Sequence, residues 1–259
     1  MASGDAQAAA FVRQFSTWWP YAGLVVVGAV FGGIGLILGP AGAVAGVLFS
    51  LVIVIWAAWS AAGRQLQDEQ LRAWSVGREL TFRDRAVVPG ATRLLRAGRY
   101  RTLNAGADGQ PAGGRVGVAF YSWTVTVGQN DTTSEATLAW ASVPSLAGLQ
   151  RLYVAAPIPG RRLRDAFGPL RLVTLGPPQF QERFAVEVND DADDAVVQRL
   201  FTPELIDWFL DRHDPAPWVE VEGRLLVVVR SGRTADPRVL DELLARVEHL
   251  AAAWRQAQG

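Results

Sequence analysis

An apolar stretch over residues 21–62 constrains this chain more than any other feature. It contains two runs, Tyr21–Leu38 and Ala43–Ala62, and neither run has a charged residue. Each run approaches the roughly 20 residues that an α-helix needs to cross about 30 Å of hydrocarbon. Because lipid offers the backbone no hydrogen-bond partners, both runs are predicted to be transmembrane helices. Gly39 and Pro40 favour a reversal of the chain between them.

Aromatic and small residues support a transmembrane hairpin over residues 18–62. Tryptophans at its two ends would meet at one membrane face, as in an aromatic belt; they are Trp18, Trp19, Trp56 and Trp59. Glycines four residues apart would let two helix backbones approach closely; they are Gly28, Gly32, Gly35, Gly39, Gly42 and Gly46. We expect these glycines to pack the two helices of one chain together, with homodimerisation through the same face as the alternative.

A cleavable signal peptide competes with the hairpin interpretation, because Arg13 precedes the first apolar run. The second apolar run favours the hairpin. Arginine also follows the hairpin, at Arg64, Arg72 and Arg78, whereas the turn between the runs is uncharged. Since an excess of arginine in short flanking segments marks the cytoplasmic side, both termini and the soluble part are expected on the cytoplasmic face of a plasma membrane.

The rest of the chain is predicted to be a tail over residues 1–17, a juxtamembrane helix over 63–77 and one soluble α+β domain over 78–259. Short β-rich runs separated by Gly, Pro and Asp indicate a mainly antiparallel sheet. Its strands are predicted over 99–105, 115–127, 135–142, 151–156, 171–175, 183–188, 218–222 and 225–229. Helices are predicted over 191–200, 203–212 and 237–256. The last has apolar residues at helical spacing and should cover one face of the sheet.

The residue types present exclude several kinds of chemistry. The chain has no cysteine, which excludes disulfides, thiolate nucleophiles and cysteine metal sites. All 25 basic residues are arginine, so no lysine can form a Schiff base. Gly-x-Ser-x-Gly and His-Glu-x-x-His motifs are also absent from the sequence. We therefore predict no catalytic residue, no metal site and no cofactor, and the lack of an RNA-binding aromatic motif argues against nucleic acid as a partner.

An acidic segment and a histidine-containing segment can each be interpreted either as part of the local structure or as a site of chemistry. The acidic run over residues 190–194 lacks the spacing of an EF-hand loop, so Asp190 or Asp191 is predicted to cap the following helix in preference to binding calcium. His213 lies beside Asp214, which leaves a His–Asp acid-base pair as an alternative to a histidine that interacts with a helix C-terminus.

Arg161, Arg162 and Arg164 form the candidate ligand-binding site of the sequence. They follow Pro159-Gly160 near a predicted helix start, where guanidinium groups and backbone amides together suit a phosphate or a lipid head group. The alternative is an exposed helix start whose arginines lie near Asp165.

A recurring pattern extends from Phe180 to Leu205. It comprises the Phe180–Val188 segment (FQERFAVEV), the acidic turn over residues 190–194 and the Leu200–Leu205 segment (LFTPEL). This arrangement resembles a family of uncharacterised two-span membrane-anchored proteins of GC-rich Gram-positive bacteria with a domain of unknown function. The resemblance covers the hairpin and most of the following domain. It implies a closing C-terminal helix, but no activity, substrate or site residue.

These observations predict a membrane-anchored, non-enzymatic interaction or scaffold module. Its expected partners are the lipid bilayer and either a protein partner or a second copy of the chain. A module that binds anionic lipid or a phosphorylated ligand is the first alternative. A membrane-bound hydrolase that uses His213 and nearby aspartates is the second.

Overall fold

The computed structural model describes residues 40–96, 98–111, 114–127, 130–146, 148–156, 170–211 and 218–258. The chain divides into two compact units, Met1–Gln70 and Leu71–Gly259. The predicted tail and the first apolar run lie outside the described residues.

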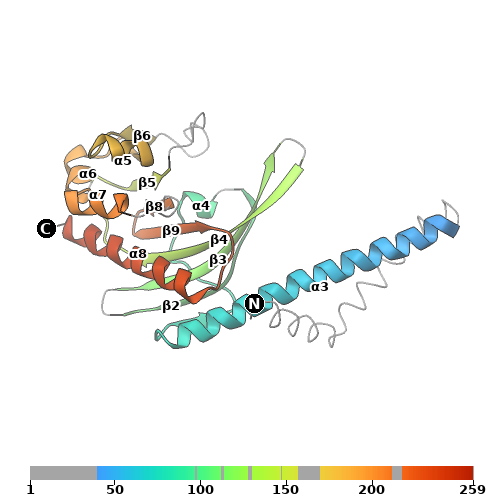
Figure 1. The fold of residues 1–259 in the computed structure, drawn as a ribbon. Coiled ribbons are helices and arrows are strands. Elements are labelled where there is room, and N and C mark those ends of the chain that lie inside the picture. Colours follow the sequence, from blue (N-terminus) through green and yellow to red (C-terminus); the bar gives the residue numbers. More distant parts are fainter. Residues whose placement is uncertain are drawn as a thin grey trace. The chain divides into compact units, whose positions relative to one another are not determined.

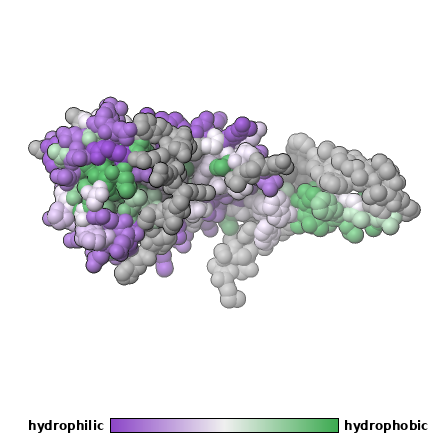
Figure 2. All heavy atoms as spheres, turned by 90° about the horizontal axis from the view of Figure 1, so that it is seen from above, coloured by the Kyte–Doolittle hydropathy of each residue, from purple (hydrophilic) through white to green (hydrophobic). Residues whose placement is uncertain are grey.

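Helix α3 (Pro40–Val76) contains the second apolar run. Within its Val44–Val76 part, the most apolar 18 residues have a mean hydropathy of 2.2, and the helix is long and apolar enough to cross a membrane. Figure 2 shows hydrophobic side chains along this helix. The large apolar side chains exposed on its described part are Val44, Val47, Leu48, Phe49, Leu51, Val52, Ile55, Trp56, Trp59 and Val76. The structure therefore contains one candidate span in its described part, and the two-span hairpin stays a prediction.

The Leu71–Gly259 unit is built on one sheet of nine strands, all paired antiparallel. The strands are β1 (Thr81–Arg83), β2 (Arg99–Gly109), β3 (Val116–Val127), β4 (Asn130–Ser142), β5 (Arg151–Ala155), β6 (Leu170–Val173), β7 (Ala185–Asn189), β8 (Trp218–Glu222) and β9 (Leu225–Ser231). Their order in the sheet is β1-β2-β3-β4-β9-β8-β5-β7-β6.

Five helices accompany the sheet among the described residues of this unit. They are α4 (Arg93–Arg96), α5 (Pro178–Arg183), α6 (Asp194–Leu200), α7 (Pro203–Leu210) and α8 (Pro237–Gln256). Helix α8 crosses one face of the sheet in Figure 1 and packs against β3, β4 and β9. The predicted α+β class, the antiparallel sheet and the closing C-terminal helix are confirmed.

The main core lies between the sheet and helices α5 to α8. Every second residue of a strand faces this side of the sheet. Residues such as Val154 and Val221 belong there to the same apolar core as Leu200 and Leu243 of the helices. The final turns of α3 also contribute, because Leu71 and Trp74 are buried in the same core. A smaller apolar cluster occupies the opposite face, where Leu94 of α4 contacts aromatic and aliphatic residues of β3, β4 and β9.

The structure corrects several sequence-based boundaries. The predicted strand over 183–188 begins only at Ala185, because Pro177 and Pro178 start the short helix α5 before it. Strand β1 and helix α4 were not predicted, since neither is long enough to show a periodic pattern.

The helix cap predicted at Asp190 or Asp191 is also wrong. Helix α6 begins later, and Asp193 caps it by accepting a 2.9 Å hydrogen bond from the Ala195 amide. Asp191 instead accepts a 2.6 Å bond from Asn189 Nδ2, and that hydrogen bond lowers the pKa of Asp191.

Candidate functional site

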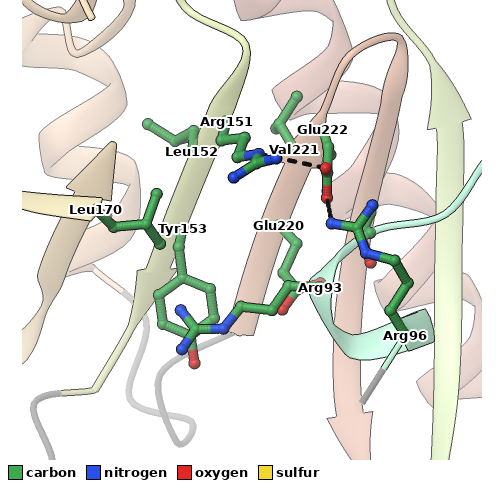
Figure 3. Close-up of a pocket in the computed structure, with 10 residues that line it drawn as sticks. Arg93, Arg96, Arg151, Leu152, Tyr153, Leu170, Glu220, Val221 and Glu222 are labelled. Atoms are coloured by element: carbon green, nitrogen blue, oxygen red, sulfur yellow. Dashed lines mark hydrogen bonds and ion pairs between the residues drawn. The ribbon is translucent and has the colours of Figure 1, made fainter. Parts of the chain in front are cut away.

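A polar cleft lies on the face of the sheet opposite α8. Side chains from β5 and β8 alternate between the two faces, so Leu152 and Val221 enter the core while Tyr153 and Glu220 face the cleft. Helix α4 contributes Arg93 to it. The cleft has an empty volume of about 330 Å³, including open solvent at its mouth. Figure 3 shows the Arg93, Tyr153 and Glu220 side chains near one another, each from a different element.

Glu220 is the most buried acid of the cleft, with 2% of its surface exposed. One carboxylate oxygen accepts a 2.8 Å hydrogen bond from the Leu94 amide, and the other accepts a 3.0 Å bond from Trp218 Nε1. Burial raises the pKa of Glu220, and these donors oppose that rise only in part. Because both oxygens hold structural donors, the carboxylate serves to fix α4 against β8.

Arg93 fills the other side of the cleft. Its guanidinium lies 5.4 Å from the centroid of the Tyr153 ring and 3.6 Å from a carboxylate oxygen of Glu187. Burial raises the pKa of Tyr153 well above its ordinary value, so this tyrosine is neutral at physiological pH. The Trp218 indole and the Tyr153 ring pack in a T-shaped arrangement with ring centroids 5.9 Å apart.

Glu222 closes the third side of the cleft. It pairs with Arg96 of α4 and lies 3.3 Å from Nε of Arg151, as the dashed lines in Figure 3 mark. The cleft thus combines three arginines with three carboxylates, those of Glu187, Glu220 and Glu222. Opposite charges are already matched within it, so the arrangement suits a structural clamp better than a reactive centre.

The described residues contain no group of three His, Asp or Glu side chains arranged to hold a metal ion. His249, on α8, stacks on Trp208 with ring centroids 4.7 Å apart. Its partner in the structure is therefore an aromatic side chain of α7.

Most residues singled out from the sequence lie outside the described part of the chain. This holds for Arg161, Arg162 and Arg164, for His213, for Trp18 and Trp19, and for Gly28, Gly32, Gly35 and Gly39. Gly42 and Gly46 lie in α3, where Ser50 donates a 2.8 Å hydrogen bond to the Gly46 carbonyl. Trp56 and Trp59 lie on α3 with 70% and 41% of their surfaces exposed.

Sequence reasoning missed the polar cleft entirely. The signal present in the sequence is the alternation Val219-Glu220-Val221-Glu222, which places two carboxylates on one face of a strand. Nothing in the sequence indicates that Arg93 and Arg96 face these carboxylates, because their pairing joins segments more than a hundred residues apart.

No protein-family model and no curated protein sequence matches this chain. Among solved structures, the crystal structure of the mycobacterial trehalose monomycolate transport factor A, TtfA, is similar, with a TM-score of 0.51 and 12% sequence identity. The similarity covers 73% of this chain and 95% of the TtfA chain. The two proteins share a fold. At this identity the likeness concerns the fold alone, and the resemblance to two-span proteins of Gram-positive bacteria stays an expectation.

Proposed function

We propose that this chain is a membrane-anchored, non-enzymatic factor that assists the transport of a lipid of the cell envelope. It would act as an interaction module, holding a protein partner or a second copy of itself at the membrane. The observation that carries the proposal is the shared fold, which extends over 95% of a protein described as a trehalose monomycolate transport factor.

The helix α3 supports the membrane location. Its apolar part presents large side chains such as Leu48, Val52 and Trp56 to the surroundings, as a helix in lipid does. The two-span hairpin and the cytoplasmic position of the domain remain part of this proposal.

The polar cleft supports a non-enzymatic role. A general acid or base needs a carboxyl oxygen that can reach a substrate. In the described cleft, the Leu94 amide and the Trp218 indole occupy the two oxygens of Glu220, and Glu222 is held between two arginines. Such groups fix the fold of the domain and leave its outer surfaces for partners.

Depletion of the protein in the organism that encodes it tests the proposal. Envelope lipids are quantified by mass spectrometry, separately for the cell surface and for whole cells. We expect one lipid to disappear from the surface and to accumulate inside, with its total amount maintained. The full chain should restore the distribution, whereas a chain without residues 1–62 should not.

Two outcomes would contradict this function. Unchanged surface lipids during depletion would exclude a transport role. A fall in the total amount of one lipid, together with accumulation of its precursor, would point to an enzyme of lipid synthesis instead.

A further inference from the structure

Strand β2 begins with an exposed bulge. Arg99 is paired with Thr124, and Thr102 is paired with Ser122, so β2 carries one residue more than β3 over this interval. Tyr100, within the bulge, has a φ of 49° and 79% of its surface exposed. A left-handed backbone is unfavourable for a bulky side chain, so the fold maintains a strained conformation that directs a tyrosine into solvent.

Gly98 fixes the position of this bulge. Its φ is 72°, and a Cβ placed on it would lie 2.5 Å from the carbonyl oxygen of Thr124. The backbone of Gly98 therefore passes directly against β3, which only glycine permits. The following residues, Arg99 to Thr102, are all exposed.

The bulge is cationic and open. Arg99 and Arg101 flank Tyr100, and Arg101 donates a 2.7 Å hydrogen bond to the Arg96 carbonyl. In the described structure neither arginine has an ion-pair partner. Strand β1 pairs with β2 only at residues 106–108, so no strand among the described residues covers this part of the edge.

The neighbouring β3–β4 tip adds little negative charge. Its one carboxylate between residues 124 and 134, that of Asp131, accepts a 2.7 Å hydrogen bond from Thr126. Val125 is exposed on the same tip. The surface around Tyr100 thus combines an exposed aromatic ring with two arginines that have no carboxylate partner among the described residues.

We propose that the Arg99–Arg101 bulge is a contact site for the head groups of an anionic lipid bilayer. Tyrosine favours the membrane–water interface, and arginines in its vicinity attract anionic lipid. The chain carries its own apolar helix of membrane-spanning length, so tethering would give the bulge a high effective concentration of lipid. This inference does not depend on the proposed transport role.

Spin labelling of the full-length chain tests this site, because the chain has no cysteine of its own. A Thr102→Cys variant places the label beside Tyr100, and Leu172→Cys on β6 places one at another site, which is 62% exposed. Both proteins are reconstituted into vesicles of phosphatidylcholine, with or without about one third of phosphatidylglycerol. Accessibility to oxygen and to a water-soluble nickel complex is then measured.

We expect the label at residue 102, and not that at residue 172, to lose nickel accessibility in the anionic vesicles. High salt should reverse the loss, because it screens exposed charges. Tyr100→Ser should weaken it, and the pair Arg99→Gln with Arg101→Gln should abolish it. The matched pair Arg224→Gln with Arg238→Gln removes the same charge from two other exposed positions and should have no effect.

Three results would overturn the proposal. In the first, the label at residue 102 stays accessible to nickel in anionic vesicles. In the second, the two pairs of arginine substitutions reduce protection equally, which would show that net charge alone is responsible. In the third, the label becomes protected only when an acidic protein is added, which would assign the bulge to a protein partner.

Discussion

The indole Nε1 of Trp74 donates a 3.0 Å hydrogen bond to a carboxylate oxygen of Asp241, which lies 167 residues further along the chain. Arg78 pairs with the same carboxylate, and its guanidinium lies 4.9 Å from the centroid of the Trp74 ring. Because Trp74 belongs to the last turns of α3 and Asp241 to the first turns of α8, this cluster joins two distant helices within the Leu71–Gly259 unit.

Replacement of Asp241 by alanine should destabilise this unit. The change leaves the Trp74 indole, which is 4% exposed, without its acceptor, and should lower the free energy of unfolding by about 1–3 kcal/mol. Denaturant unfolding followed by tryptophan fluorescence measures it. Asp84→Ala is the control, because the Arg72–Asp84 pair is largely exposed and should contribute less than about 1 kcal/mol. Equal effects of the two substitutions would show that the Trp74–Asp241 bond has no special role.

Glu220 should make stability depend on pH. Since burial raises its pKa in the folded state above the ordinary value of 4.5, the folded protein holds this proton more tightly than the unfolded chain does. The tighter binding of this proton adds fully to the free energy of unfolding below pH 4.5, and this stabilisation is lost as the pH rises through the folded-state pKa of Glu220. Relative to Glu220→Gln, the wild-type protein should therefore lose stability over that range. Denaturation curves at a series of pH values give the comparison, and parallel profiles for the two proteins would rule the effect out.

Gly98→Ala should be more damaging than Gly223→Ala. The methyl group would approach the Thr124 carbonyl while the backbone keeps a positive φ, at a combined cost of about 2–4 kcal/mol. Gly223 has a φ of 59° but no atom within 4 Å of an added Cβ, so Gly223→Ala should cost only about 1 kcal/mol. Thermal unfolding of both variants separates the steric from the conformational contribution, and similar melting temperatures would argue against the close approach.

Single cysteines at Ser3 and Gln258 test the number of spans. If the hairpin forms, both termini lie on one side of the membrane, so a membrane-impermeant maleimide should treat the two positions alike in intact cells. Permeabilised cells provide the control for reactivity. Labelling of only one position in intact cells would establish a single crossing and replace the hairpin interpretation.

Long periodic segments were predictable from the sequence. The final helix was predicted with the bounds Pro237–Gln256 that the structure shows, because its apolar residues repeat at helical spacing and Pro237 occupies its first turn. The start of helix α7 at residue 203 and the two strands on either side of Gly223 were also predicted, since each depends on local backbone chemistry. The order of these elements along the chain was therefore predicted as well.

Features that depend on distant contacts were not predictable. Helix α4 is four residues long, and the bond from its Leu94 amide to Glu220 stabilises it against the sheet. The bulge at Tyr100 likewise arises from register with β3, which no local pattern in Arg99–Arg101 reveals. The cleft and the bulge are both products of strand pairing.

The position of β9 has a consequence for how the protein is made. This strand pairs with β4 on one side and β8 on the other, yet it follows both of them in the chain. During synthesis, the facing edges of β4 and β8 therefore lack their partner until β9 has been made. Unpaired edges of this kind invite association with other chains. A product that terminates before β9 would thus carry two unpaired strand edges and would be prone to aggregate, which makes complete synthesis of β9 a requirement for correct folding.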